Sequence, residues 1–288
     1  MDHTFAIPVY HAAAPRLAAL IDSLRAQTTG GSEILLATST PSGELEDFAQ
    51  RERLPLHVNP NRLGIAADWN FAFEAARTTR VTLAHQDDVF APAYLARLTA
   101  ALERHPGALI AFSDYAEHTS SGPRPRKINL RLKRALCERA FRGRACISDP
   151  RDKLRLLSLG NPICCPSVLF NRPALGEFRF PQGFQTNLDW MAWLELARRP
   201  GGFVYVRECL LSKGVHADSE TSVTIANRAR MREDRALFES IWPWPMAAAL
   251  AVLYRLGYLA NRVAPSYLPL ADTRDPAGNQ RDADPLQR

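Results

Sequence analysis

The sequence lacks several patterns that would assign it to a common protein class. Its five cysteines form no CxxC pair and no zinc-ligand spacing, which excludes the usual structural zinc sites. Its longest apolar stretch, around residues 247–253, is shorter than the ~20 residues that a membrane-spanning helix needs. No signal-peptide pattern follows Met1, and a predicted strand begins almost at once. We therefore expect a reduced, cytoplasmic protein without a membrane span of its own.

Aromatic residues make up only 9% of the chain, and acidic residues are outnumbered by basic ones, which leaves a net charge of +6. This charge favours polyanionic surfaces or phosphorylated ligands, and by itself it does not distinguish nucleic acid, anionic lipid and nucleotide diphosphates. The 288 residues, of which 46% are hydrophobic, suffice for one large α/β domain, alone or with a smaller C-terminal appendage.

Short apolar runs alternate with helical patterns through the first hundred residues. Such alternation predicts a mostly parallel sheet with helices on both faces. In a sheet of this kind the ligand crevice lies beyond the carboxyl ends of the strands, where short polar segments follow each run. The predicted strands are residues 5–10, 33–38, 56–58 and 81–84, and the predicted helices between them are residues 15–25, 42–51 and 65–78.

Asp87 and Asp88 directly follow the predicted strand at residues 81–84, and Pro92 then starts a helix. Two carboxylates at this edge suit Mg²⁺ or Mn²⁺, which proteins often hold with one or two carboxylates together with substrate phosphates. The alternative is an acidic helix N-terminus, which capping and the helix dipole favour. The two residues alone leave both interpretations open.

Several motifs in order resemble the family 2 glycosyltransferases of the GT-A fold, from residue 5 to about residue 224. Ile7-Pro8-Val9-Tyr10 is similar to that family's first strand and donor-base loop. Asn61-Arg62-Leu63-Gly64, followed by Asn70, is similar to the start of its donor-side helix. His85-Gln86-Asp87-Asp88 stands where the family's DxD motif ends a strand. The resemblance implies an inverting enzyme that uses a nucleotide-sugar donor.

Two later residues complete the resemblance. Asp189 resembles the acidic position that acts as catalytic base in inverting members, where it would accept the proton of the attacking acceptor hydroxyl. An ordinary first-turn helix charge is the alternative. His216 resembles a late histidine that helps to hold the metal, and a surface-loop histidine is the alternative.

The chain also departs from the family pattern at two positions. The second predicted strand ends in Thr38 and Ser39, where the family usually places an aspartate for the base and ribose, so hydroxyl groups would have to substitute. His85 replaces the first DxD carboxylate, and an imidazole ligand favours Mn²⁺ somewhat over Mg²⁺. The resemblance thus implies a metal set of Asp87, Asp88 and His216, and a donor-binding set of Pro8, Val9, Tyr10, Thr38, Ser39, Asn61, Arg62, Gly64, Asn70, His85, Asp87 and Asp88.

Residues 123–144 carry nine Lys or Arg and a single Glu, interleaved with Leu130, Leu132, Leu136 and Phe141. A solvated helix face and contact with an anionic membrane surface fit this basic arm equally well. Nucleic acid is not expected, because few aromatic residues accompany the charge.

The C-terminal Trp242, Trp244, Tyr254, Tyr258 and Tyr267 suggest an interfacial helix pair or, as the favoured interpretation, simple core packing. Adjacent Cys164 and Cys165 are expected to be buried packing residues.

We therefore expect a GT-A-like α/β domain with a helical C-terminal extension. Its function would be inverting transfer from a nucleotide-diphosphate sugar to a glycan or lipid-linked acceptor, in cell-surface polysaccharide, lipopolysaccharide or glycolipid synthesis, in the cytoplasm or at the inner face of the cell membrane. The alternatives are a nucleotide-sugar-binding or nucleotidyltransferase-like enzyme without a base role for Asp189, and a non-catalytic membrane-docking protein.

The expected boundaries are a catalytic domain at 1–224 (nucleotide-sugar and metal half 1–115, basic arm 116–148, acceptor half 149–224), a helical extension at 225–271 and a disordered tail at 272–288.

Overall fold

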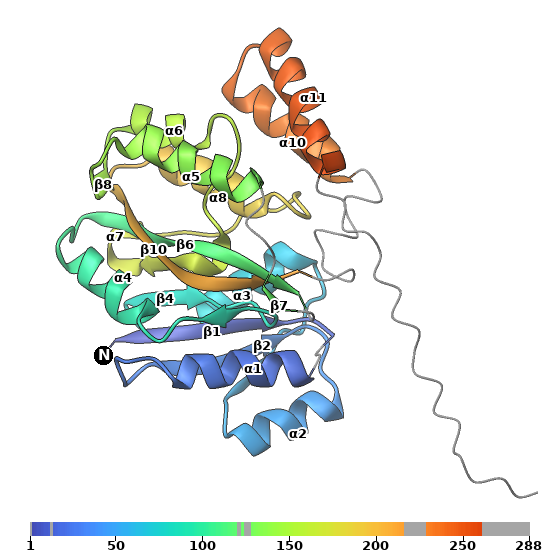
Figure 1. The fold of residues 1–288 in the computed structure, drawn as a ribbon. Coiled ribbons are helices and arrows are strands. Elements are labelled where there is room, and N and C mark those ends of the chain that lie inside the picture. The colour runs from blue at the N-terminus through green and yellow to red at the C-terminus, as the bar shows by residue number, and fades with distance from the viewer. Residues whose placement is uncertain (1, 12–13, 120–121, 124–127, 216–228, 261–288) are drawn as a thin grey trace, which may run out of the picture.

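The structure is a computed structural model, and it describes residues 2–11, 14–119, 122–123, 128–215 and 229–260. Its centre is one mixed sheet with the strand order β3-β2-β1-β4-β9-β6-β10-β5 (Figure 1). The parallel part of this sheet consists of β1 (His3–Val9), β2 (Glu33–Thr38), β3 (Leu56–Val58) and β4 (Arg80–Leu83). These strands are connected by α1 (Ala14–Arg25), α2 (Gly43–Glu52) and α3 (Ile65–Ala75), so the predicted alternation of strands and helices is confirmed.

Beyond β4 the sheet mixes directions. β9 (Val168–Asn171) runs antiparallel between β4 and the long β6 (Ala108–Thr119), while β10 (Gly202–Gly214) lies parallel to β6. Three short strands extend this half by antiparallel pairing, namely β5 (Val89–Phe90) and β8 (Cys146–Ile147) on β10, and β7 (Gly122–Pro123) on β6. The predicted α/β sheet is therefore present, with antiparallel strands added to its parallel part.

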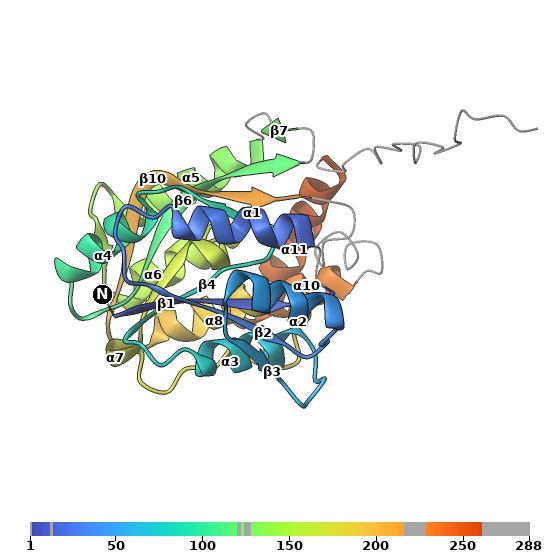
Figure 2. The ribbon, with the colours of Figure 1, turned by 90° about the horizontal axis from the view of Figure 1, so that it is seen from below.

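The two faces of the sheet bury two separate hydrophobic clusters. Side chains alternate along a strand, so Phe5 and Ile7 of β1 join one cluster and Ala6 joins the other. Helices α1, α2 and α4 (Tyr94–Glu103) cover the first face, and α1 and α2 stand in front of the sheet in Figure 2. The opposite face is covered by α3, α5 (Ile128–Phe141), α6 (Pro150–Leu157) and α8 (Leu188–Arg198). The remaining short elements are η1 (Cys165–Ser167) and α7 (Arg172–Leu175).

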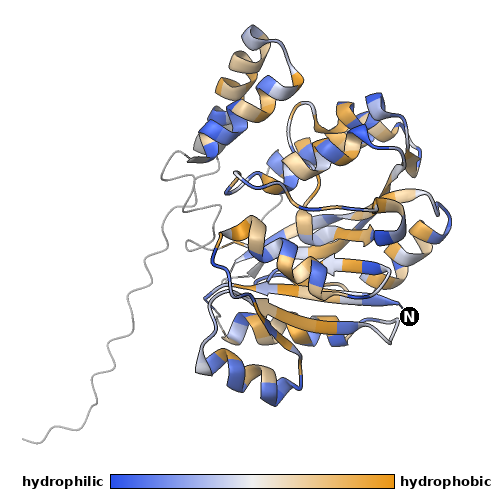
Figure 3. Cartoon of the chain, turned by 180° about the vertical axis from the view of Figure 1, so that it is seen from behind, coloured by the Kyte–Doolittle hydropathy of each residue, from blue (hydrophilic) through white to orange (hydrophobic). Residues whose placement is uncertain are grey.

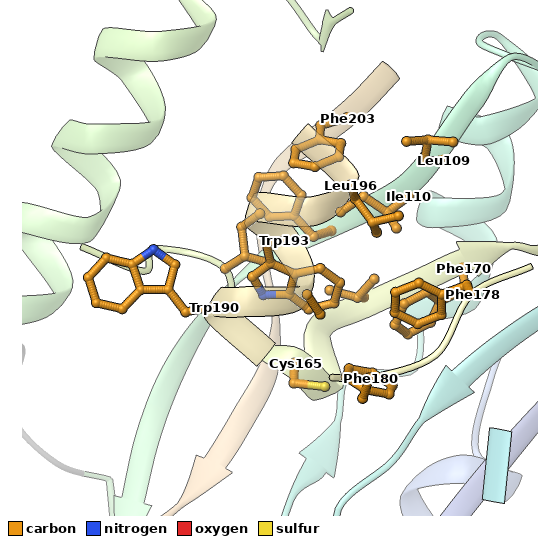
Figure 4. Close-up of a cluster of buried hydrophobic side chains, with 14 of the residues drawn as sticks. Leu109, Ile110, Cys165, Phe170, Phe178, Phe180, Trp190, Trp193, Leu196 and Phe203 are labelled. Atoms are coloured by element: carbon orange, nitrogen blue, oxygen red, sulfur yellow. The ribbon is translucent and has the colours of Figure 1, made fainter. Parts of the chain in front are cut away.

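Helix α8 is the most deeply buried helix of the second face. Trp193 packs between phenylalanines, with its ring centroid 5.7 Å from that of Phe170, and Trp190 lies on the other side of the helix (Figure 4). The C-terminal end of α8 depends on Lys153 of α6, whose side chain is fully buried. Its Nζ donates to the carbonyl oxygens of Leu196 at 3.4 Å, Arg199 at 2.6 Å and Gly201 at 2.8 Å. Because the Leu196 carbonyl also accepts from the Arg199 N–H, the ammonium group mainly holds the two carbonyls that follow the helix.

Two C-terminal helices, α10 (Ala229–Ile241) and α11 (Trp244–Ala260), pack on the same core. The Trp190 ring lies 5.4 Å from Phe238 and 5.6 Å from Tyr254, and Trp242 Nε1 donates to the carbonyl oxygen of Ser158 at 2.8 Å. Core packing is therefore confirmed for Trp242 and Tyr254, whereas Trp244 is 66% exposed. The predicted tail at 272–288 lies outside the described residues, as do Tyr267 and His216. None of the described helices combines the length and hydropathy that crossing a membrane requires.

The segment predicted as a basic arm is built into the domain. Leu130 and Phe141 of α5 are buried in the two clusters, while Leu132 is exposed. Much of the positive charge also points to partners in the protein, because Arg134 Nε lies 2.8 Å from Asp114 Oδ2 and Lys133 Nζ donates to the Tyr115 hydroxyl at 2.7 Å. The alternation of leucine and arginine here belongs mainly to a helix packed against the sheet.

Replacing Lys153 by methionine is expected to lower the free energy of unfolding by about 2–4 kcal/mol, because the carbonyl oxygens of Arg199 and Gly201 lose a charged donor in a buried place. Urea denaturation followed by circular dichroism measures this loss. Arg151→Met, an exposed position on the same helix, is the matched control and should change stability by less than about 0.5 kcal/mol. Equal effects of both substitutions would contradict a structural role for the Lys153 ammonium.

Candidate functional site

The carboxyl ends of β1, β2 and β4 meet at one edge of the sheet, because these neighbouring strands are parallel. Two hydrogen bonds tie the loops there together. Gln86 Nε2 donates to the carbonyl oxygen of Tyr10 at 3.0 Å, and the backbone N–H of His11 donates to Thr40 Oγ1 at 3.3 Å. Pro8 and Val9 end β1 beneath them, and the Tyr10 side chain is half exposed. The predicted donor-side loops are therefore adjacent.

A carboxylate from α3 fills the place where the second strand lacks an acidic residue. Thr38 and Ser39 are buried at the end of β2, and Ser39 Oγ donates to Asp68 Oδ2 at 2.9 Å. Asn59 Nδ2 donates to the other oxygen of Asp68 at 3.2 Å. Asp68 was not predicted as a site residue, because first-turn acids are common in helices, although its position four residues after Gly64 was a visible signal.

The predicted motif around α3 separates into two parts. Arg62 Nε donates to the carbonyl oxygen of Ser39 at 2.8 Å, and the Asn61 N–H donates to the side chain of Asn59 at 3.1 Å, so both residues belong to the crevice loops. Gly64 has φ of +91°, which a residue with a side chain adopts only with strain. Asn70 instead uses both ends of its amide on the backbone of Phe180, at 2.9 and 2.7 Å, and its contacts do not support donor binding.

The carboxylate of Asp88 is buried, with 1% of the residue exposed. Its Oδ1 accepts a hydrogen bond from the N–H of Gly214 at 3.0 Å, while its Oδ2 has no hydrogen-bond partner among the described residues. Burial raises the pKa of Asp88 well above its ordinary value, and the neighbouring Asp87 adds to this shift. A buried carboxylate oxygen without a proton donor is a group that a cation would satisfy.

Gly214 allows the end of β10 to touch the turn that carries the two aspartates. A Cβ atom at this position would lie 2.2 Å from the carbonyl oxygen of Asp87, far closer than atoms approach. Only glycine therefore permits the Asp88–Gly214 hydrogen bond in this geometry. The constraint fixes β10 against the 85–88 turn.

His85 lies on the indole ring of Trp69, with ring centroids 4.8 Å apart. Its Nε2 is buried and finds no hydrogen-bond partner in the part of the chain that the structure describes. Burial lowers the pKa of His85 to about 4, so the imidazole is neutral at neutral pH. A neutral ring nitrogen can act as an acceptor or as a metal ligand.

Lys213, next to Gly214 on β10, was not predicted from the sequence. Burial acts to lower its pKa, but Cys164, Asp88 and Asp189 outweigh burial and raise the pKa overall. The residue therefore stays charged and lies within electrostatic reach of both the aspartate turn and Asp189. The available signal was a lysine just after the apolar Leu210-Leu211 near the end of a strand.

Asp189 sits in the first turn of α8, as predicted. Its Oδ1 accepts from the N–H of Trp190 at 2.7 Å and its Oδ2 accepts from Asn161 Nδ2 at 3.0 Å. The Asn161 amide is itself oriented, because its Oδ1 accepts from the N–H of Ile163 at 3.1 Å. Burial raises the pKa of Asp189, although Lys213 opposes the shift. Asp189, Lys213 and the aspartate turn thus form one charged cluster.

Asp87 and Asp88 fit a divalent ion, since two adjacent carboxylates and a buried free oxygen are enough when substrate phosphates supply further ligands. Within the described part of the chain, no three His, Cys, Asp or Glu side chains gather in a metal-ligand cluster. His216, the predicted third ligand, lies outside that part. Cys164 and Cys165 are buried and free, which confirms their packing role.

An α/β sheet with paired carboxylates at its edge and a half-buried acid beyond it agrees with a nucleotide-sugar-dependent glycosyltransferase of the GT-A type, the class that the family and fold comparisons support. The family described as glycosyl transferase family 2 matches residues 4–172, which is more than half of the chain. The chain therefore belongs to glycosyl transferase family 2. Its predicted family, fold class and glycosyltransferase activity are confirmed.

Solved structures share the fold at low sequence identity. TarS (residues 1–349) of S. aureus is 12% identical with a TM-score of 0.60, over 90% of this chain and 73% of that one. The same protein in complex with UDP-GlcNAc is 11% identical with a TM-score of 0.59, over 91% and 73%. The mannosyltransferase PcManGT from Pyrobaculum calidifontis, in complex with GDP-Man and Mn²⁺, is 15% identical with a TM-score of 0.55, over 92% and 76%. No curated protein matched the chain.

Gly214→Ala is expected to reduce sugar transfer by at least about 100-fold, because the new methyl group pushes β10 away from the 85–88 turn. Initial rates of nucleoside diphosphate release measure the loss. Gly43→Ala is the matched control, since nothing lies within 4 Å of a Cβ there, and it should retain wild-type rates. A fully active Gly214→Ala variant would show that the close approach is not needed.

Proposed function

We propose that the protein transfers a sugar from a nucleotide-diphosphate donor to an acceptor hydroxyl with inversion at the anomeric carbon. Asp189 is the general base in this proposal. The observation that carries it is the environment of this carboxylate, which is half-buried, oriented by Trp190 and Asn161, and within electrostatic reach of Lys213, which also faces the Asp87–Asp88 turn. A carboxylate with a raised pKa that lies beside the donor site suits the removal of a proton from an alcohol.

The acceptor oxygen attacks the anomeric carbon from the face opposite the diphosphate. As the new carbon–oxygen bond forms, the bond to the diphosphate oxygen breaks and takes its electron pair with the leaving nucleoside diphosphate. The hydroxyl proton passes to Asp189. Two hydrogen bonds hold the Asp189 side chain in one rotamer. An oxygen lone pair therefore stays directed toward the acceptor hydroxyl.

The donor nucleotide is assigned to the loops at the ends of β1 and β2. Pro8, Val9 and Tyr10 would line the base, and Thr38, Ser39 and Asp68 would meet the base or ribose through their hydroxyl and carboxylate groups. Asn61 and Arg62 close the same crevice. Asp68 supports this assignment because it supplies the acidic group that β2 lacks.

Asp87 and Asp88, with His85 beside them and His216 as a further candidate, would hold Mn²⁺ or Mg²⁺. When bound, the ion neutralises charge that builds up on the departing diphosphate. Lys213 adds a fixed positive charge on the same side, which the chain supplies itself. The acceptor class we propose is a glycan or lipid-linked intermediate of cell-surface polysaccharide, lipopolysaccharide or glycolipid synthesis, supported by the family membership alone.

A donor panel tests this function. The purified protein is incubated with UDP-GlcNAc, GDP-Man and other nucleotide sugars, each with Mn²⁺, Mg²⁺ or EDTA, and thermal shift and diphosphate release are followed. One donor should raise the melting temperature only with metal, and Asp87→Ala should abolish that shift. Asp189→Asn should keep the shift and lose at least about 100-fold in turnover.

The variant results separate the alternatives. Wild-type turnover by Asp189→Asn would remove the base role and favour a nucleotide-sugar-binding or nucleotidyltransferase-like enzyme. An absent shift with every donor would favour a non-catalytic docking protein. Glu103→Gln, an exposed carboxylate at the end of α4, is the control for loss of an acidic group and should behave as wild type.

We also propose that the enzyme works at an anionic membrane surface and docks there through α11. The exposed face of this helix carries Trp244, Met246, Val252 and Leu253, which are between 48% and 66% exposed. The helix stands at the margin of the molecule (Figure 3), and the net charge of +6 suits anionic lipid. This placement is compatible with a cytoplasmic, peripheral enzyme.

Co-sedimentation with vesicles tests the docking. The protein should bind vesicles that contain anionic lipid more tightly than neutral ones, and Val252→Glu combined with Leu253→Glu should weaken binding by about tenfold or more, since two apolar contacts are lost. Val58→Glu is the control, because Val58 is an exposed apolar residue on β3, the strand at one edge of the sheet. Equal binding by the α11 variant and the control would assign docking elsewhere.

A further inference from the structure

The helix that carries the proposed base begins without a cap of its own. Asn187 occupies the N-cap position of α8, yet its side chain makes no capping hydrogen bond. Its amide instead donates to Asp234 Oδ1 of α10 at 2.8 Å. Asp189 accepts from the Trp190 N–H inside the first turn, but the N–H groups of Asn187 and of the residues just before it need an acceptor from outside this segment.

Glu233 of α10 supplies that acceptor. Its Oε1 accepts from the N–H of Gln185 at 2.6 Å, and its Oε2 accepts from the N–H groups of Thr186 and Asn187, both at 3.0 Å. The Thr186 hydroxyl adds a fourth bond at 2.7 Å. One carboxylate therefore holds three consecutive backbone N–H groups, and its negative charge also suits the positive end of the helix dipole.

This attachment lies immediately before the base. Asp189 is two residues after Asn187, and its Oδ1 is bonded to the N–H of Trp190 in the same turn. The carboxylate therefore moves with the first turn of α8. A shift of that turn would move the carboxylate of Asp189 away from the sugar. The donor loops would stay in place.

The second support of Asp189 also rests on the C-terminal helices. Asn161, which donates to Asp189 Oδ2, follows Gly160, and the backbone of Asn161 hydrogen-bonds the Tyr254 hydroxyl of α11. A Cβ at Gly160 would lie 3.1 Å from the Tyr254 ring, so α11 is seated directly on this turn. Both groups that orient the base are thus held by the α10–α11 pair.

We propose that the α10–α11 pair is part of the active site and that Glu233 is a positioning residue, whose carboxylate fixes the start of α8 and thereby the proposed base Asp189. The proposal rests on the base role of Asp189. It concerns acceptor activation alone, because the donor loops lie on β1, β2 and β4 and make none of these contacts.

Steady-state kinetics of the full chain with its donor and acceptor test this role. Glu233→Ala should lower kcat by about 10- to 100-fold with the donor KM within about twofold of wild type, because misplacement of a reacting group affects the chemical step. Glu233→Gln keeps one acceptor oxygen and should fall between the two. Glu239→Ala, six residues further on α10 and paired only with the exposed Arg235, is the matched control and should retain wild-type kinetics.

The pH profile separates positioning from general stabilisation. The Trp190 N–H bond lowers the pKa of Asp189, so loosening this turn should move the acidic limb of kcat to higher pH. The charged or titratable groups that face Asp189 remain in the variant. They are Lys213 of β10, Arg230 of α10, Lys133 of α5, Tyr115 of β6, Tyr254 of α11, and Cys164 and Cys165 near η1. An unchanged acidic limb together with an unchanged kcat in a folded Glu233→Gln variant would overturn the proposal, and this variant decides the question if Glu233→Ala does not fold.

A double-mutant cycle distinguishes this proposal from that of the base. If Glu233 acts through Asp189, Glu233→Ala should cause no further loss in an Asp189→Asn background. An equal loss in both backgrounds would show that Glu233 acts elsewhere and would leave the base role intact. Wild-type turnover by Asp189→Asn alone would instead remove the base role.

Discussion

The placement of helix α8 is the constraint on which the catalytic side of the molecule depends. Both ends of this helix are held by charged residues of other helices. Lys153 of α6 donates to carbonyls just after α8, and Glu233 of α10 accepts from the N–H groups of residues 185–187 just before it. Between these ends, Trp190 and Trp193 fill the core on two sides. A helix buried in this way cannot shift without breaking charged hydrogen bonds, and its first turn carries Asp189.

The donor side depends on a different contact, the close approach of Gly214 to the Asp87–Asp88 turn. Strand β10 brings Lys213 to the same place, so one strand end both orients a carboxylate and supplies a balancing positive charge. Asp88 is buried at a cost that a partner N–H offsets only in part. Among the described residues Asp88 Oδ2 still has no hydrogen-bond partner, which suits a site that holds a cation beside a diphosphate.

The sequence was sufficient for features that local pattern determines. The parallel strands, the position of Asp87 and Asp88 after β4, and the first-turn position of Asp189 all follow from apolar runs and short motifs. Lys213, Asp68 and Glu233 could not be found in this way, because their importance comes from contacts across long sequence separations. Asn70 shows the converse, since it matches a motif while its amide bonds the backbone of Phe180. The basic arm holds both kinds of position, because Leu130 is packed in the core while Leu132 is exposed, and a local pattern does not separate the two.

The C-terminal pair joins two surfaces that the sequence suggested only separately. Its inner face contacts both supports of Asp189 through Glu233 and Tyr254, and its outer face exposes Trp244, Val252 and Leu253. If α11 docks on a bilayer, a displacement of α11 changes the position of Asp189 through α10 and α8. The donor loops are not part of this chain of contacts. A lipid-linked acceptor would then arrive on the side of the protein where the base is held. Such an enzyme would keep donor binding independent of membrane attachment while tying proton removal to it.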